Sequence, residues 1–353
     1  MNNFIEYFYG IKVGKINYNE KYYSFFNNGY LYKMYIINDD GKEINSLISI
    51  NKKLIKSTLV SEIVINRNNE AVSIYNGNGF ILIKIYVNTN QKISLMEIVT
   101  LNNSMYLEKL NINWGILWEK KIDYLEDLIN ENGKKYPLIV DSFNYFVGLA
   151  ENAISYYYDI KIEPNYKYVL SHKTIKMNDT IEALYNPLNI IFDYKTRDIS
   201  EYIKISFFNE NKKIFEELMF YLQNNNLLLT DIKLLIARVL YPSFYFDLYE
   251  DIMIYNKKEN IITPIINKID DYEEYLYKII SFFKKYYDID EIEWLKKRKY
   301  YNWGDLHSHN YSIYSSLTTF ITSGISFIKA DSMPLSRVWS ARGQLLHAPI
   351  NLT

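Results

Sequence analysis

Cysteine is absent from this chain of 353 residues, which excludes disulfide bonds, thiolate catalysis and zinc sites with cysteine ligands. A charge excess is absent too, because 40 Lys and Arg residues face 41 Asp and Glu residues, a net charge of −1. Nothing global therefore draws the chain to nucleic acid or to an anionic membrane, and we expect no nucleic-acid partner.

Long apolar runs are also missing. No stretch reaches the roughly 18–20 apolar residues of a membrane-spanning helix. The first six residues contain no basic segment that leads into an apolar one, so the sequence predicts neither a signal peptide nor a membrane span. We expect synthesis in the cytoplasm.

Tyrosine, by contrast, is abundant, with 36 residues. Together with frequent Asn, Ile and Lys, this abundance is most simply attributed to an AT-rich genome. The alternative is a tyrosine-rich surface for packing or cross-linking between proteins, because tyrosine combines an apolar ring with a polar hydroxyl.

The first 88 residues have the pattern of a small sheet with one helix. Residues 22–26 and 30–37 are rich in aromatic and β-branched residues and flank the turn Asn27-Asn28-Gly29, which predicts a hairpin. Residues 62–65 and 80–87 predict further strands, and the apolar positions between 40 and 57 predict a single helix.

From about residue 113 the apolar residues recur with helical spacing, first between Trp118 and Gly133. Asp198 and Thr230 are predicted N-caps. Further helices are predicted from Asp141 and over residues 199–208, 212–224, 231–241, 244–255 and 271–286, with a β-region at 168–170 and 188–192 between them.

This order of elements predicts an α+β, two-lobed, protein-kinase-like fold. We expect a β-rich N-lobe over residues 1–88, a connector over 89–112 and a helical C-lobe over 113–295. Residues 296–353 differ in composition, with no tyrosine after Tyr314 and no lysine after Lys329. They are interpreted as an atypical tail, either disordered or not native to the fold.

Four segments of the chain resemble the YutH-type spore coat proteins, a branch related to CotS and to the aminoglycoside and choline phosphotransferases. They are Trp114–Glu119, Asp141–Ala153, Phe192–Ile203 and Ala237–Phe246. The resemblance extends over roughly residues 1–295 and is most specific in the helical lobe. It implies an aminoglycoside-phosphotransferase-like fold, a role in endospore formation, deposition on the spore coat and other coat proteins as partners.

The resemblance also implies that the catalytic loop is degenerate. In active relatives a His-Gly-Asp triplet supplies the aspartate that acts on the acceptor hydroxyl. The matching residues here are His172, Lys173 and Thr174, so that threonine stands at the aspartate position. Threonine cannot accept a proton at neutral pH, and His172 is expected to be a hydrogen-bonded structural residue.

Two carboxylates are the candidate Mg²⁺ ligands. Asp193, at the end of the predicted strand, matches the family's metal-binding aspartate, and Asp179 lies five residues after Thr174. The favoured alternative for Asp193 is a turn residue that binds its own loop, because one carboxylate alone binds Mg²⁺ poorly. Arg197 and Asp198 are expected to be structural, with Asp198 capping the next helix and bracing the loop.

The candidates for nucleotide binding are Lys33, on a predicted strand, and Glu43, its partner on the predicted helix. Lys84 lies on another strand, and either lysine could equally be solvated. The candidate glycine loop, Gly10 to Gly14, lacks the spacing of phosphate-binding loops.

Near the C-terminus, Asp305, His307 and His309, with Asn310 after them, resemble both a phosphotransferase catalytic loop and the first metal motif of PHP-type phosphoesterases. The position of this motif after Asp193, and the few residues that follow it, argue against both interpretations. The basic and aromatic segment at 296–301 is interpreted as a solvated helix end.

Three functions follow as hypotheses. The leading one is a non-catalytic scaffold or binding protein of the spore coat, for which no cofactor is required. The second is an active small-molecule phosphotransferase that uses Asp193 with ATP and Mg²⁺. The third is a metal-dependent hydrolase at residues 305–309.

Overall fold

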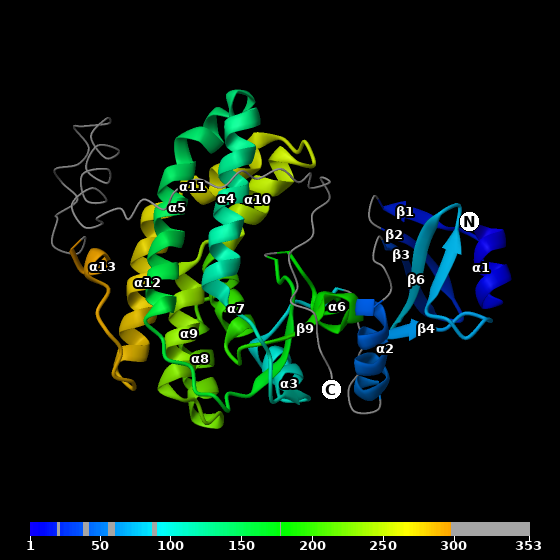
Figure 1. Ribbon diagram of the computed structural model, residues 1–353, viewed down its shortest axis with the longest axis horizontal. Coiled ribbons are helices and arrows are strands. Elements are labelled where there is room, and N and C mark those ends of the chain that lie inside the picture. Colours follow the sequence, from blue (N-terminus) through cyan, green and yellow to red (C-terminus); the bar gives the residue numbers. More distant parts are fainter. Residues whose placement is uncertain (20–21, 38–41, 56–60, 87–89, 177, 298–353) are drawn as a thin grey trace, which may run out of the picture. The chain divides into compact units, whose positions relative to one another are not determined.

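The computed structural model describes residues 1–19, 22–37, 42–55, 61–86, 90–176 and 178–297. Among them, residues 1–289 form one compact unit, and residues 290–297, with helix α13 (Glu293–Lys297), belong to a second (Figure 1). The predictions made for residues 298–353, including the motif at 305–309, lie outside the described residues.

The N-terminal part of the chain is an antiparallel sheet in which the described residues form six strands. The strand order is β1-β2-β3-β6-β4, and β5 pairs with β6. The strands are β1 (Asn17–Asn19), β2 (Tyr22–Asn27), β3 (Tyr30–Ile37), β4 (Glu62–Val64), β5 (Val72–Tyr75) and β6 (Asn78–Ile85).

The predicted hairpin is β2-β3, closed by a two-residue turn at Asn28 and Gly29. Both turn residues have positive φ, 48° and 80°, which is the conformation that a tight hairpin turn requires and that Asn-Gly adopts most easily. A turn of the same type connects β5 and β6, where Asn76 and Gly77 have φ of 49° and 78°. Strand β5 was not predicted from the sequence.

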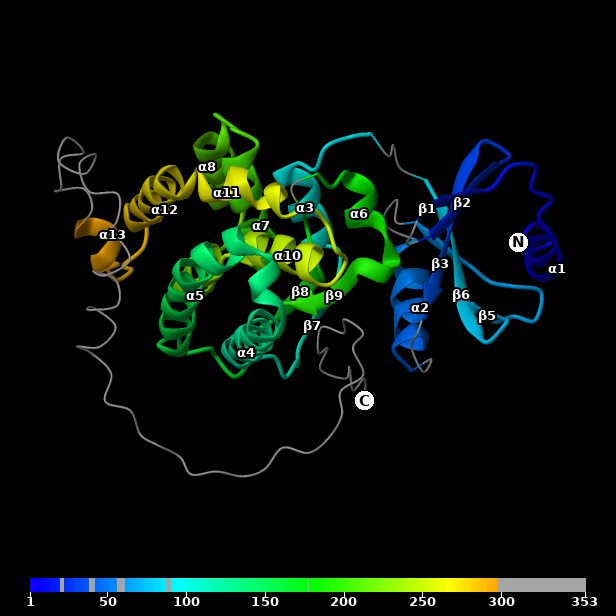
Figure 2. The ribbon, with the colours of Figure 1, turned by 90° about the horizontal axis from the view of Figure 1, so that it is seen from above.

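Each face of the sheet is covered by one helix. Helix α1 (Asn2–Tyr9) contributes Phe4 and Ile5 to an apolar cluster on one face, and helix α2 (Lys42–Leu54) contributes Ile44 to a second cluster. Figures 1 and 2 show α1 and α2 on opposite sides of the strands. The prediction of one helix in this region was therefore wrong, since α1 precedes the sheet.

The helices that follow agree with the predicted helical period. They are α3 (Leu95–Asn102), α4 (Trp114–Asn132), α5 (Pro137–Tyr158), α6 (Ile181–Tyr185), α7 (Arg197–Phe208), α8 (Ile214–Asn224), α9 (Leu229–Leu240), α10 (Ser243–Met253), α11 (Thr263–Ile266) and α12 (Ile269–Lys284), with 3-10 turns η1 (Gly133–Lys135), η2 (Pro187–Asn189) and η3 (Glu259–Ile262). The α+β, sheet-then-helices architecture is thus confirmed. Helices α3, α6 and α11 were not predicted.

A small antiparallel sheet, with strand order β7-β8-β9 among the described residues, interrupts these helices at the predicted place. Its strands are β7 (Tyr106–Leu107), β8 (Tyr168–His172) and β9 (Ile190–Asp193). In the register, Leu170 faces Phe192 and His172 faces Ile190. The segment that resembles a catalytic loop leaves the end of β8, and β9 ends at Asp193.

Three predicted helix starts were wrong. Helix α5 begins four residues before Asp141, at Pro137, whose fixed φ and missing N–H suit the first helical turn. Asp198 and Thr230 were expected as N-caps but lie inside α7 and α9. Both side chains hydrogen-bond to distant residues instead.

Aromatic rings contact one another throughout the core of the helical region, and two close pairs are stacked. Phe146 of α5 stacks on Tyr245 of α10 with ring centroids 3.7 Å apart, and Trp118 of α4 stacks on Tyr241 at 4.5 Å. Buried aromatic rings contribute large apolar areas, so these pairs hold α4 and α5 against the end of α9 and the start of α10. Within the described ranges, no helix combines the length and the hydropathy that a membrane crossing requires.

Candidate functional site

The candidate site lies where β8, β9 and the start of α7 meet. A single side chain, that of Arg197, joins the three elements. Its guanidinium donates to the backbone oxygens of His172 (2.8 Å) and Lys173 (2.7 Å) and to the Asp193 carboxylate (2.5 Å). Because these three acceptors are satisfied together, the backbone of the loop and the end of β9 are fixed relative to each other.

His172 is held inside the protein by both ring nitrogens. Nδ1 lies 2.7 Å from Asp198 Oδ2, and Nε2 lies 2.9 Å from the backbone oxygen of Leu184. The His172 and Asp198 side chains are fully buried. Both partners are oxygen atoms, so each ring nitrogen is occupied by one contact within the protein. His172 therefore has the geometry of a structural brace, with no ring nitrogen directed at a reacting group.

The Asp198 carboxylate binds the loop instead of capping its helix. Besides the imidazole, it accepts from the backbone N–H of His172 at 3.1 Å and from the amide of Asn102 at 3.2 Å. The expected role of Asp198 in bracing the loop is confirmed, and the expected role as an N-cap is wrong. The reason is tertiary, because burial against β8 offers this carboxylate stronger donors than the first turn of α7.

Thr174 stands half-buried at the position of the absent catalytic aspartate. Its backbone N–H donates to Asn189 Oδ1 (3.2 Å), and its carbonyl accepts from Asn189 Nδ2 (2.9 Å). The neighbouring Lys173 donates its backbone N–H to the carbonyl of Asn189 at 2.8 Å. The side chain and backbone of one asparagine thus fix the loop at Lys173 and Thr174.

Asp193 is completely buried, and donors surround its carboxylate. Oδ1 accepts from the indole N–H of Trp114 (3.0 Å) and from the backbone N–H of Tyr194 (2.7 Å), and Oδ2 accepts from Arg197. A guanidinium therefore lies where a cation would bind, and Oδ1 already has two donors. In this arrangement the carboxylate does not fit a Mg²⁺ site, because the ion needs several free oxygen ligands.

Asp179 accepts a hydrogen bond within its own loop. Its Oδ2 accepts from the backbone N–H of Lys176 at 2.7 Å, three residues earlier, in a turn of the loop. Across the part of the chain that the structure describes, no three Asp, Glu or His side chains form a group that could hold a metal ion. The two predicted metal ligands are therefore separate residues of one loop and one strand.

Lys33 is paired with a residue that the sequence did not suggest. Its ammonium group forms an ion pair with Glu182 of α6 and lies 4.4 Å from the ring centroid of Tyr22. Glu43 belongs to α2, and its side chain lies outside the described residues. Gly10 ends α1 in a left-handed conformation (φ 69°), so it serves as a helix C-cap.

Beside the site, α7 buries a second set of charges. The Glu201 carboxylate accepts from Arg238 Nε (2.8 Å), Lys204 Nζ (3.0 Å) and Ser243 Oγ (2.9 Å). Burial alone would raise the pKa of Glu201, but the charges of Lys204 and Arg238 lower it to about 2. Burial lowers the pKa of Lys204 to about 8 against the attraction of Glu201.

One of these buried charges, Arg238, contacts the candidate site through the ring of Trp114. The Arg238 guanidinium lies 4.7 Å from the ring centroid of Trp114, the residue that donates to Asp193. Sequence reasoning missed this set. Its signal was the spacing of Glu201 and Lys204, three residues apart, in a helix whose other residues from Ile199 onward are apolar or serine.

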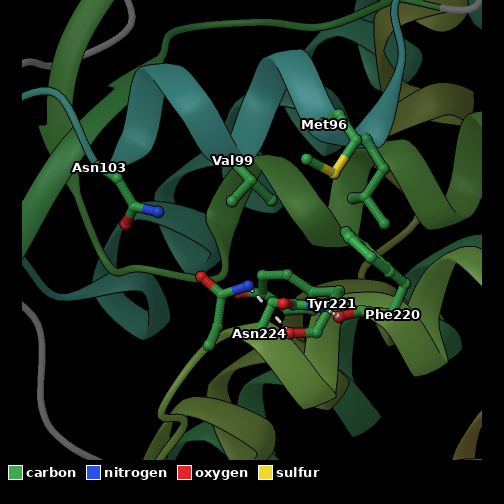
Figure 3. A pocket seen from close by; sticks show the side chains of 8 residues that line it. Met96, Val99, Asn103, Phe220, Tyr221 and Asn224 are labelled. Atoms are coloured by element: carbon green, nitrogen blue, oxygen red, sulfur yellow. Dashed lines mark hydrogen bonds between the residues drawn. The ribbon is translucent and has the colours of Figure 1, made fainter.

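A separate small pocket lies between α3 and α8, with a volume of about 90 Å³. Figure 3 shows Met96 and Val99 of α3 opposite Phe220 and Tyr221 of α8. Asn224 and Asn103 add amides, and the Asn224 amide already donates to the backbone oxygen of Phe220 at 2.8 Å. The pocket has room for an apolar side chain, and its lining residues offer no carboxylate or imidazole.

The fold defines a kinase-like protein, and at its candidate site the strand-end aspartate is bound to an arginine. The chain belongs to the family described as "Spore coat putative kinase YutH", whose model matches residues 2–282. This finding confirms the resemblance seen in the sequence.

A relative is the endospore coat-associated protein YutH of Bacillus subtilis (strain 168), 28% identical over 184 residues. The match covers 46% of this chain and 54% of that protein, so the chain matches about half the length of this relative.

Among solved structures, the chain is similar to an aminoglycoside phosphotransferase from Alicyclobacillus acidocaldarius subsp. acidocaldarius DSM 446. The TM-score is 0.54 and the identity 8%, over 77% of this chain and 92% of the other. A spectinomycin phosphotransferase, APH(9)-Ia, in an AMP-bound complex gives a TM-score of 0.47 and 12% identity over 79% and 93%. The likeness to the first structure shows the fold alone.

Proposed function

We propose that this chain is a non-catalytic binding or scaffold protein of the spore coat, built on a degenerate kinase-like fold. It is made in the cytoplasm and deposited on the coat, where its partners are other coat proteins. Membership of the spore coat family supports this proposal, as does the name of the Bacillus subtilis relative.

The observation that carries the proposal is the state of Asp193. In phosphoryl transfer the protein positions the substrates and neutralises charge, chiefly through metal-binding carboxylates and a carboxylate at the acceptor. Here the strand-end carboxylate is neutralised by Arg197, and the residue at the acceptor position is Thr174. Restoring one of the two groups by substitution would still leave the other absent.

The first experiment is a thermal unfolding titration with ATP and Mg²⁺, run beside a phosphate-transfer assay over a broad acceptor panel. A ligand at 100 times its Kd stabilises a protein by about 2.7 kcal/mol, which such a titration detects easily. We expect that neither the parent chain nor the Thr174→Asp variant shows saturable stabilisation together with phosphate transfer. Saturable stabilisation together with phosphate transfer would overturn the proposal.

The second experiment tests the coat assignment. A fluorescent fusion of the full chain, expressed in sporulating cells, is expected to move from the cytoplasm to the spore surface and to remain with the coat fraction. A fusion that stays in the cytoplasm throughout sporulation contradicts this part of the proposal and leaves the catalytic part to the first experiment.

The alternative is an active small-molecule phosphotransferase that uses ATP and Mg²⁺. It is favoured by one observation, that Asp193 ends β9 beside the loop of His172 in a fold shared with a phosphotransferase. This alternative requires Arg197 to release the carboxylate when nucleotide binds. It predicts turnover that Asp193→Asn abolishes, and an absence of turnover over the whole panel would dismiss it.

A further inference from the structure

One segment of the helical region is attached to the N-terminal sheet by four different residues. It comprises residues 181–189, between β8 and β9 in the sequence, and contains α6 and η2. Glu182 forms the ion pair with Lys33, and the side chains of this pair are only 14% and 12% exposed. The Asn186 amide donates to the hydroxyl of Tyr35 at 3.3 Å.

The other two contacts use the backbone and an apolar side chain. The backbone N–H of Ser61, just before β4, donates to the carbonyl of Tyr185 at 2.9 Å. Leu188 packs against the apolar cluster that Ile44 of α2 forms with Ile81 and Ile83 of β6. The segment therefore combines an ion pair and a hydrogen bond to β3, a hydrogen bond to the residue before β4, and apolar burial against the cluster that α2 covers.

These contacts fall on one face of the sheet. Lys33 and Tyr35 are two residues apart on β3, so their side chains project to the same face, and they lie opposite Ile83 and Ile81 in the register. This is the face that α2 covers. Figure 1 shows α6 on the same side of the strands as α2.

The segment is equally firmly held at its other end. The carbonyl of Leu184 binds the ring of His172, and the Asn189 amide donates to the carbonyls of Thr174 (2.9 Å) and Ala183 (3.0 Å). The backbone N–H of Ile181 donates to the carbonyl of Gln91 in the connector at 2.9 Å. A displacement of the sheet therefore cannot be absorbed by movement of the segment alone.

We propose that residues 181–189 act as an internal clamp that holds the N-terminal sheet and the helical region together without any ligand between them. In a two-lobed protein joined by a connector, movement of the lobes is expected unless the interface is well packed. Here four contacts must break at once before the sheet can move. The clamp makes the protein a rigid unit, a property that its proposed function as a scaffold does not require.

The test measures opening of the connector in the full-length chain by limited trypsin digestion. Lys92 is an exposed trypsin site whose backbone is bridged to Thr180, directly before the clamp. Cleavage after Lys92 is followed by mass spectrometry in the parent chain and in Glu182→Gln and Leu188→Ala. We expect both substitutions to raise the cleavage rate about fivefold or more, with unchanged far-UV circular dichroism.

The matched control is Glu62→Gln. Glu62 follows Ser61 in the chain, but its side chain binds the hydroxyl of Tyr86 and makes none of the four clamp contacts. Its cleavage rate is expected to stay within about twofold of the parent rate. Parent-like rates in both clamp variants, or an equal acceleration in Glu62→Gln, would overturn the proposal.

A double-substitution cycle separates the clamp from general destabilisation. If Lys33 and Glu182 act through their mutual contact, the Lys33→Gln/Glu182→Gln variant is cleaved no faster than the faster single variant. If the increases in cleavage rate of the two single variants multiply in the double variant, the two residues act independently. The ion pair would then be no part of a clamp. ATP turnover does not enter this test, so its outcome is independent of the proposed function.

Discussion

Replacing Glu201 by glutamine tests the buried charges that support the candidate site. The side chain keeps its shape and loses its charge, which leaves the Lys204 ammonium and the Arg238 guanidinium buried without a counterion. Lowering the pKa of a carboxyl group from 4.5 to about 2 corresponds to about 3 kcal/mol of stabilisation of the charged form. Removing one partner of a buried ion pair destabilises proteins by about 3–5 kcal/mol.

We therefore expect Glu201→Gln to reduce the free energy of unfolding by about 3 kcal/mol at pH 7, measured by urea denaturation. The matched control is Glu274→Gln in α12. Glu274 pairs with Lys278, four residues on, but its side chain is 64% exposed. Exposed pairs of this kind contribute about 0.3–0.5 kcal/mol, so the control is expected to lose no more than that.

The pH dependence gives a second measurement on the same variant. The pKa of Glu201 is lower in the folded chain, so its contribution to stability is complete above pH 4.5 and is lost as the pH falls toward about 2. The difference in the free energy of unfolding between the parent chain and Glu201→Gln should decrease by about 1.4 kcal/mol when the pH is lowered from 7 to 3.5. A loss below about 1 kcal/mol at pH 7, or a difference independent of pH, would refute the reasoning.

Three further substitutions test single contacts. Arg197→Met leaves Asp193 buried without its cation, so we expect a loss of about 3 kcal/mol in urea denaturation, and a loss under about 1 kcal/mol would show that the arginine does not hold the loop. Trp114→Phe removes the indole donor to Asp193 and should destabilise by about 1–2 kcal/mol, whereas an unchanged transition midpoint would contradict that hydrogen bond. Gly29→Ala places a side chain at φ 80° and should lower the free energy of unfolding by about 1 kcal/mol, measured by thermal unfolding. The added methyl group meets open space, so this loss would come from the backbone conformation alone. Equal stability of the variant and the parent would argue against the tight turn.

Local patterns were sufficient for much of the fold. The Asn28-Gly29 turn, the start of β4 at Glu62 and the helical period from Trp114 onward depend on short-range preferences that the residues themselves carry. Helices α1 and α3 were missed although both had local signals. In α3 the signal is a capping box, in which Ser94 and Glu97 bind each other's backbone N–H groups.

At the candidate site, the sequence and the tertiary structure determined different properties. The sequence alone determined the identity of the residues at the motif, because Thr174 at the aspartate position is read directly from the chain. The sequence alone did not determine the roles of the charged residues. A carboxylate beside a strand end can cap a helix, bind a metal or neutralise an arginine, and local preferences do not distinguish between these roles when the partner is distant.

Only the tertiary structure decided which partner each charge received. Lys33 meets Glu182, a residue 149 positions away in the chain. Asp198 turns from its own helix to His172, and Asp193 is enclosed by Trp114 and Arg197. The physical reason is burial, because a charge removed from water must be matched by whichever opposite charge or donor the packing brings within reach.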